Sequence, residues 1–277
     1  MAGFQRKYLF WLLAGLLAGL LPLLDPHTGM GELTRNVSKY GQLSVLETPY
    51  AYLYLHVFTF IPVFALSFDS RVHYYRSWKA LFPAVLLVGV IFIVWDVYFT
   101  YKGVWGFNEQ YLSGYFLFKL PVEEWLFFFT VPFACVFIYE CLNYYLPWNP
   151  FLNRERLITT GLMLFSFLVA ILFHKNIYTA TTFALCGWLL SLHLYAWDAK
   201  RASLIRSRFY MAYLVSCIPF VIVNGALTGS FTKSPIVMYN DTENLGSRLG
   251  SIPLDDFGYS FLLLFGVTTL YELFKKK

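Results

Sequence analysis

The sequence predicts an all-α integral membrane protein, a bundle of about eight transmembrane helices built from two tandem repeats in the same orientation. Of its 277 residues, 58% are hydrophobic and 13% are charged, whereas soluble chains carry about a quarter charged residues. The mean hydropathy is +0.56, and the apolar residues fall in runs long enough to cross a bilayer as helices. A transmembrane β-barrel is disfavoured because its strands would alternate apolar and polar residues. The third observation is a repeated acidic motif, described below.

The expected transmembrane spans are the apolar runs of the chain. They cover residues 8–24, 50–68, 79–100, 118–142, 157–173, 177–197, 209–227 and 253–274. The first run resembles the apolar region of a signal peptide, and its removal would leave seven spans. It is followed by Pro22-Leu-Leu-Asp-Pro26 instead of a small-residue cleavage site, so we expect it to be a helix.

The basic residues predict the orientation of the chain in the membrane. With the N-terminus in the cytoplasm, the cytoplasmic loops and ends receive 14 of the 21 Lys and Arg residues and the opposite side receives 6, with Lys119 at a boundary. Positively charged loops are typical of the cytoplasmic side. Both termini are therefore expected to be cytoplasmic, in the cell membrane. The basic residues form no patch with interleaved aromatic residues, and no nucleic-acid partner is expected.

Two segments of the chain share a motif at an offset of 132 residues. Residues 120–124 read Leu-Pro-Val-Glu-Glu and residues 252–256 read Ile-Pro-Leu-Asp-Asp, and each precedes an apolar run that ends in Tyr-Glu. An even number of spans separates the two copies, so they have the same orientation. We expect an N-terminal extension over residues 1–49, a first repeat over 50–150 and a second repeat over 151–277.

Acidic residues at a membrane span are costly and mark functional sites by default. Glu123 and Glu124 follow Pro121, and Asp255 and Asp256 follow Pro253. Proline suits the first turn of a helix, so all four acids are expected near the start of a helix. A fifth acid, Asp96, lies near the end of the third span. On the predicted topology all five acids lie toward the non-cytoplasmic side.

The alternative is that these acids only complement the positive end of the helix dipole. Three features indicate a functional role in addition: the motif occurs twice, both copies are paired acids, and aromatic residues surround them. Neighbouring helical residues point about 100° apart, so one member of each pair can face a given cavity. A close carboxyl pair is then expected across the two halves, and such a pair favours one protonated acid.

An acid in an aromatic, lipid-accessible cavity suits carbocation chemistry, because aromatic faces attract cations. Five motifs bear on this chemistry: Trp95-Asp-Val-Tyr-Phe-Thr-Tyr-Lys-Gly-Val-Trp-Gly-Phe107, Leu120-Pro-Val-Glu-Glu-Trp125, Ala134-Cys-Val-Phe-Ile-Tyr-Glu140, Asn224-Gly-Ala-Leu-Thr-Gly229 and Ile252-Pro-Leu-Asp-Asp256. Together they resemble the integral membrane lycopene β-cyclase family. The resemblance is to the fused, single-chain form of a cyclase otherwise made of two small subunits.

The resemblance implies a non-redox conversion of the ψ-ends of lycopene, through γ-carotene, to the β-rings of β-carotene. It implies Glu123 or Glu124 as proton donor, Asp255 or Asp256 as partner or acceptor, and Asp96 as a supporting acid. The residues expected to bind substrate or to orient the acids are Trp95, Trp105, Phe107, Trp125, Phe128, Asn224 and Thr228. Its partners are lycopene, γ-carotene and the lipid membrane, with contact to other carotenoid enzymes as a further expectation.

No cofactor or metal is expected. The sequence has no GxGxxG motif after a predicted strand to hold a flavin, and its four cysteines form no CxxC pair. The alternatives are a carotenoid hydratase, which would trap the cation with water, a membrane terpene cyclase, or a small transporter. A prenyltransferase is disfavoured by the lack of an Asp-rich DxxxD motif, and a retinal photoreceptor by the lack of a lysine within residues 253–274.

Overall fold

A computed structural model describes Trp11 and residues 13–19, 31–35, 37 and 39–275. Most of the expected span 8–24 lies outside these residues, although residues 13–19 are helical within it. The other seven expected spans each correspond to one helix. These are α2 (Ala51–Leu66), α3 (Trp78–Lys102), α4 (Val122–Tyr145), α5 (Glu155–Leu172), α6 (Ile177–Tyr195), α7 (Ala199–Leu227) and α8 (Asp255–Phe274).

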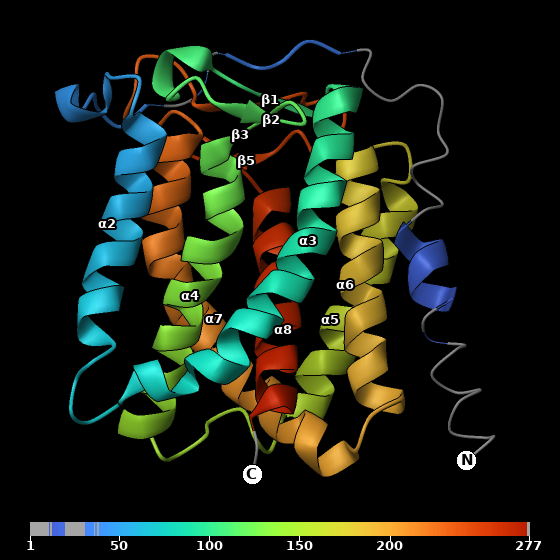
Figure 1. The fold of residues 1–277 in the computed structure, drawn as a ribbon. Helices are drawn as coiled ribbons and strands as arrows, with labels where there is room; N and C mark the ends of the chain where they lie inside the picture. The colour runs from blue at the N-terminus through green and yellow to red at the C-terminus, as the bar shows by residue number, and fades with distance from the viewer. Residues whose placement is uncertain (1–10, 12, 20–30, 36, 38, 276–277) are drawn as a thin grey trace.

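The helices form one bundle, with the connecting segments at its two ends (Figure 1). Among the described residues, six helices are long and apolar enough to cross a membrane, and α2 is a shorter apolar helix. Their outer faces present apolar side chains, as at Leu86, Ile91 and Val94 of α3, which are 67%, 65% and 65% exposed. A lipid environment accounts for such faces, which water would disfavour. The predicted all-α membrane bundle is therefore confirmed.

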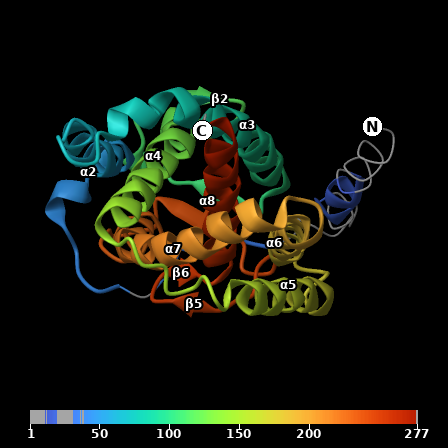
Figure 2. The same cartoon turned by 90° about the horizontal axis from the view of Figure 1, so that it is seen from below.

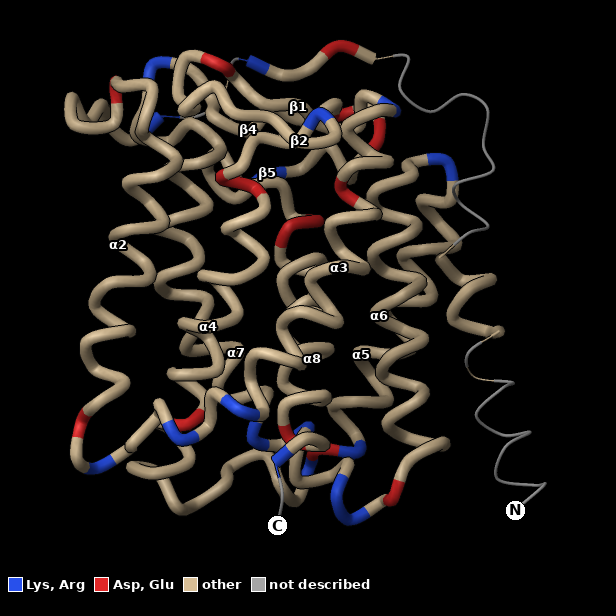
Figure 3. The backbone as a smooth tube through the Cα atoms, in the orientation of Figure 1, with Lys and Arg blue, Asp and Glu red and all other residues tan. Residues whose placement is uncertain are grey.

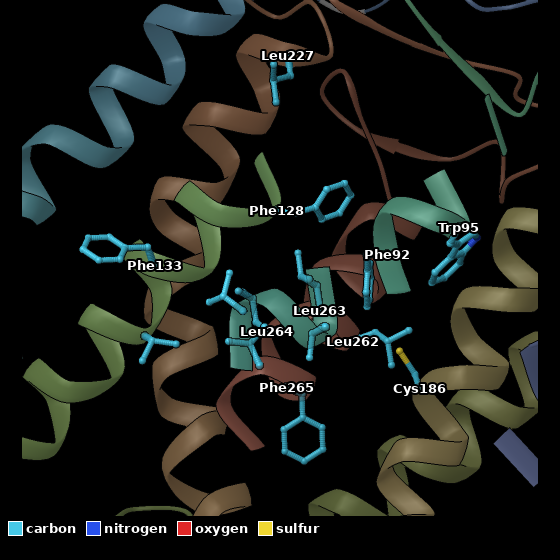
Figure 4. Close-up of a cluster of buried hydrophobic side chains, with 14 of the residues drawn as sticks. Phe92, Trp95, Phe128, Phe133, Cys186, Leu227, Leu262, Leu263, Leu264 and Phe265 are labelled. Carbon is cyan, nitrogen blue, oxygen red and sulfur yellow. The ribbon is translucent and has the colours of Figure 1, made fainter. Parts of the chain in front are cut away.

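The core lies where α3, α4 and α8 meet. Phe92 and Phe128 contact each other there, beside Leu262 and Leu263 of α8 (Figure 4). The contacts between helices repeat in pairs. Helix α3 packs against α8 as α7 packs against α4, and α2 packs against α4 as α6 packs against α8 (Figure 2). This pairing places α4 and α8 side by side at the centre.

Two short hairpins precede α4 and α8. Strands β2 (Phe116–Leu117) and β3 (Leu120–Pro121) form the first, and β5 (Arg248–Leu249) and β6 (Ile252–Pro253) form the second. Phe116 pairs with Pro121 and Arg248 pairs with Pro253, so the two hairpins have the same register 132 residues apart. The prolines end the hairpins, one and two residues before the helices begin, slightly earlier than the expected first helical turn.

A third strand pair joins the two halves. Strand β1 (Trp105–Phe107) is antiparallel to β4 (Val237–Tyr239), and Gly106 pairs with Met238 at its centre. Gly106 and Met238 are themselves 132 residues apart, so the pairing has approximate two-fold symmetry. It brings Trp105 and Tyr239 opposite each other above the bundle. The remaining short elements are the 3₁₀ turns η2 (Ser44–Leu46), η3 (Tyr74–Ser77) and η4 (Glu109–Tyr111).

The two ends of the bundle differ in charge. Lys and Arg residues gather at the end where α2 finishes, α7 begins and the C-terminus lies, while the paired acids lie toward the other end (Figure 3). At the basic end, the side chain of Asp198 accepts a hydrogen bond from the Arg201 N–H at 2.8 Å and caps α7. Glu123 and Glu124 lie in the first turn of α4, whose 24 residues span about 36 Å, so the paired acids are far from the basic end.

Candidate active site

A cavity of about 320 Å³ lies between α2, α4, α7 and α8 and is covered by β1 and β4. Three of its lining residues are acids: Asp96 from α3, Glu124 from α4 and Asp256 from α8. All three are buried. The cavity therefore brings together one acid from each repeated motif, as the 100° spacing of helical neighbours predicts, together with the acid from the third expected span.

The two motif acids have matching tyrosine partners. The Tyr52 hydroxyl of α2 donates to Glu124 Oε2 at 2.7 Å, and the Tyr178 hydroxyl of α6 donates to Asp256 Oδ1 at 2.7 Å. Each tyrosine is the second residue of its helix, Tyr52 in α2 and Tyr178 in α6. Each half thus supplies one acid and the phenol that orients it.

The other two motif acids hold the preceding loops in place. The Ser113 backbone N–H donates to Glu123 Oε1 at 2.8 Å, and the Leu245 backbone N–H donates to Asp255 Oδ2 at 3.0 Å. Thr179 also donates to Asp255, at 2.5 Å. Both carboxyls are fully buried, and neither is among the residues that line the cavity. These hydrogen bonds connect each loop to the first turn of the helix that follows it.

Asp256 receives three hydrogen bonds. Besides Tyr178, Asn224 Nδ2 donates to its Oδ2 at 2.7 Å and the Tyr239 hydroxyl donates to the same oxygen at 3.0 Å. Burial, together with the adjacent Asp256 carboxylate, raises the pKa of the Tyr239 hydroxyl well above its usual value, so it is a neutral donor at physiological pH. Three donors and no acceptor suit a carboxylate at this position.

Asp96 has a different environment. Trp105 Nε1 donates to its Oδ1 at 2.5 Å, while its buried Oδ2 has no hydrogen-bond partner among the described residues. Asp96 and Asp256 both lie close enough to Glu124 for their charges to interact. Two neighbouring carboxyls in a site with little water favour holding a proton between them. Glu124 and Asp96 each accept one hydrogen bond from a described residue, whereas Asp256 accepts three, so Glu124 and Asp96 are the acids better arranged to carry it.

Aromatic rings surround the acids. Trp105 contacts Tyr178 and Tyr259 with ring centroids 5.1 and 6.1 Å apart, and Phe107 and Tyr239 line the same cavity. The indole N–H of Trp105 and the hydroxyls of Tyr52, Tyr178 and Tyr239 contact the three carboxyls. A cation formed in this cavity would be stabilised by the rings and by the carboxylate charge.

The structure separates the predicted substrate-binding residues into two groups. Trp105, Phe107 and Asn224 line the cavity. The other four do not: Trp95 packs against Phe92 and Tyr259, Phe128 packs in the core, Trp125 contacts Phe118, and Thr228 donates to the Asn224 backbone carbonyl at 2.8 Å. Trp95 is adjacent to Asp96 on α3, and neighbouring helical residues point about 100° apart, so Trp95 does not face the cavity that Asp96 lines.

The cavity reaches the outer surface between α2 and α7. Its lining includes Phe58 and Pro62 on α2 and Pro219 and Val223 on α7. Phe58 is 62% exposed, and a proline stands inside each of the two helices. We call this opening the α2–α7 mouth. It lies on the apolar outer face of the bundle, the surface that lipid would cover.

Sequence reasoning missed four tyrosines of the site, Tyr52, Tyr178, Tyr239 and Tyr259. Tyr52 and Tyr178 stand 126 residues apart, not 132, so the offset of the acidic motif does not align them. The offset changes after Gly103 and Gly229, which both have a positive φ just beyond α3 and α7. A search for tyrosines at the starts of equivalent spans would have found the pair.

The fold and site define a multi-pass membrane protein with an acid-lined, aromatic cavity open to lipid. The family model described as lycopene cyclase matches residues 49–142 and 175–274, which together make up most of the chain. The chain therefore belongs to the lycopene cyclase family, and membership supports a carotenoid cyclase role. The two matched segments agree with a fused chain that contains two repeats. No curated protein and no solved structure gives a significant match.

The described residues include no group of three or more His, Cys, Asp and Glu side chains placed to hold a metal ion. The cavity acids are instead engaged by tyrosine, asparagine and tryptophan donors.

Proposed function

We propose that this protein is a lycopene β-cyclase that uses carboxyl groups to start and finish cyclisation. One observation carries the proposal: the cavity-facing acids of both repeats meet in one aromatic cavity that opens to lipid. The family membership supports the same activity. The enzyme would be an intramolecular lyase, or isomerase, since its product has the same composition as its substrate.

The proposed reaction begins with a proton. Glu124, which shares its surroundings with Asp96, donates a proton to C2 of the terminal isoprene unit and leaves a tertiary cation at C1. The C5–C6 double bond attacks C1, which closes the ring and moves the positive charge to C5. Loss of a proton from C6 to Asp256 forms the C5–C6 double bond of the β-ring. One proton is added and one is removed, so no oxidant or reductant is required.

The hydrogen bonds support this division of roles. Among the described residues, Tyr52 alone donates to Glu124, whereas Asp256 accepts from three donors. A carboxyl with few donors can keep a proton, and one with three donors is held as the carboxylate. Trp105 and Tyr259 would steady the intermediate cations through their ring faces.

The size of the cavity supports reaction at one end of the substrate at a time. At about 320 Å³ it is near the lower limit of ligand pockets, which run from about 300 to 1,000 Å³. It suits an end group of lycopene, while the polyene chain would extend through the α2–α7 mouth into the bilayer. γ-Carotene would then leave and return with its second end.

The organisation of the chain forms part of the proposal. We propose a duplication with repeats over residues 50–150 and 151–277 and an extension over 1–49, supported by the hairpins of equal register. The basic end of the bundle supports a topology in which both termini lie in the cytoplasm and the acids lie toward the other side. The membrane would be the cell membrane.

The test is expression of the chain in a bacterium that accumulates lycopene, followed by chromatography of the pigments. β-Carotene, with γ-carotene at early times, is the expected result. Unchanged lycopene, with the protein present in the membrane, would contradict the proposal. A hydroxylated, uncyclised product would identify a carotenoid hydratase, because water would then have trapped the cation.

A further inference from the structure

A second cavity lies at the basic end of the bundle, opposite the acids. It has a volume of about 610 Å³ and is formed by the end of α4, the start of α7 and the end of α8. Four cations line it: Lys200, Arg201, Arg208 and Lys275. Two carboxylates, Asp198 and Glu272, line it as well, so its charge is positive.

Most of this positive charge is not neutralised. Lys275 pairs with Glu140 at 2.7 Å and with Glu272 at 3.7 Å. Within the described part of the chain, Lys200, Arg201 and Arg208 form no ion pair with a carboxylate.

Neutral oxygens hold the two guanidinium groups in place. Arg208 Nη1 donates to Asn143 Oδ1 at 3.1 Å, and its two terminal nitrogens donate to the Leu146 and Pro147 carbonyls, each at 3.4 Å. Arg201 Nη2 donates to the Glu272 backbone carbonyl at 2.5 Å. These contacts fix orientation but leave the charge and several N–H donors available.

Arg206 provides the contrast. It lies on the same helix and is buried, but its guanidinium contacts Glu155 Oε2 at 2.6 Å and the His193 carbonyl at 2.5 Å. Arg206, a buried cation of α7 with a structural role, is therefore neutralised by a carboxylate. The same is not true of Arg201 and Arg208, which face the cavity.

The length of α7 places the cavity at the level of lipid headgroups. Its 29 residues span about 44 Å, whereas the hydrocarbon layer is about 30 Å thick. The first turns of α7 carry Lys200, Arg201 and Arg208, whereas residues 209–227 are apolar, so the first turns are the part expected to extend beyond the hydrocarbon. Leu204, which is 46% exposed, lines the cavity among the cations. Apolar surface beside oriented guanidinium groups suits a ligand with an anionic head and an acyl chain.

We propose that this cavity binds a phosphate group, supplied by an anionic phospholipid whose headgroup lies between α4, α7 and α8. Arginine binds phosphate oxygens through paired N–H donors, and basic pockets between transmembrane helices suit anionic headgroups. A free phosphate compound shares the recognition chemistry, but it would make no use of Leu204. The site is separate from the acid cavity and does not depend on the reaction proposed for it.

The test uses the full chain, purified in detergent and titrated with phosphatidylglycerol or phosphatidylcholine. Native mass spectrometry counts the retained lipids, and a second series uses pyrophosphate without lipid. Tighter retention of phosphatidylglycerol, weakened about tenfold or more by Arg208→Gln, is the expected result, since a hydrogen bond to a charged group is lost. Arg156→Gln is the matched control, because Arg156 is an exposed cation at the same end that does not line the cavity.

Three other outcomes are informative. Equal retention of phosphatidylglycerol by the wild type and by Arg208→Gln would overturn the proposal. Binding of pyrophosphate that matches the lipid in strength and in sensitivity to Arg208→Gln would keep the phosphate site but assign it to a soluble ligand. If Arg208→Gln does not fold, Lys200→Gln replaces it, because Lys200 is exposed and lies at the cavity without an ion pair; unchanged retention by this variant would then overturn the proposal.

Discussion

The two neighbouring glutamates of α4 allow a test in which each is the control for the other. Glu124 lines the cavity and accepts from Tyr52, whereas Glu123 accepts from the Ser113 backbone and does not line it. Glu124→Gln removes the proposed acid but keeps an oxygen that can accept from Tyr52. A general acid contributes about 10²- to 10⁴-fold to a rate, so we expect cyclisation to fall by that factor while the protein stays folded.

Glu123→Gln is expected to behave in the opposite way. Its amide oxygen can still accept from Ser113, so we expect the free energy of unfolding to fall by only about 1 kcal/mol. Activity per folded molecule should stay near that of the wild type. The second repeat offers the same comparison, with Asp256→Asn as the inactive variant and Asp255→Asn as the active one.

The assay is β-carotene formed in membranes from a lycopene-accumulating bacterium, divided by the amount of folded protein measured by size-exclusion chromatography. Activity of Glu124→Gln above about a tenth of the wild type would refute the assignment of the proton donor, because the loss of rate would be smaller than the factor of about 10² or more that a general acid contributes. Equal losses in Glu123→Gln and Glu124→Gln would refute the separation of roles.

Three further predictions follow from the cavity and from the buried ion pair. Tyr178→Phe removes one of three donors to Asp256 and should lower turnover about tenfold or more, measured in the same assay. Val223→Trp should narrow the α2–α7 mouth and slow lycopene consumption, whereas Trp at the neighbouring Ile222, which is exposed and does not line the cavity, should not; equal rates would argue against access there. Arg206→Met should lower the free energy of unfolding by about 3–5 kcal/mol by leaving Glu155 buried and unpaired, and adding Glu155→Leu should restore most of it in thermal unfolding.

Most of the fold could be predicted because lipid imposes a simple rule on the sequence. Each span must be a long apolar helix, so runs such as 79–100 and 253–274 correspond closely to α3 and α8. The run 209–227 gives only part of α7, because the helix begins at Ala199 and its first ten residues include four Lys or Arg, which lower the local hydropathy. Hydropathy therefore predicts the apolar part of a helix and not its full length.

The acids of the site could be predicted for a similar reason, since charge is rare and costly within a span. Their partners could not. Tyrosine is common throughout this chain, with 21 residues, so nothing in composition marks Tyr52 or Tyr239. Tyr239 reaches Asp256 only because β4 pairs with β1 across the two halves, a contact between distant segments that local patterns do not encode.

The choice within each acid pair depended on helix phase. The sequence indicates that one member of each pair faces inward, but the phase is fixed by how the preceding hairpin joins its helix. The backbone N–H groups of Ser113 and Leu245, each ten residues before its acid, hold Glu123 and Asp255. The following residue then turns toward the cavity.

The most direct test of the central claim is to supply lycopene to the purified protein in lipid nanodiscs, without added flavin or nicotinamide, and to determine the mass and ring structure of the products. The account predicts γ-carotene followed by β-carotene, both with the mass of lycopene, and loss of both products in Glu124→Gln. Products that differ in mass by water or by hydrogen, or cyclisation that persists in Glu124→Gln, would contradict it.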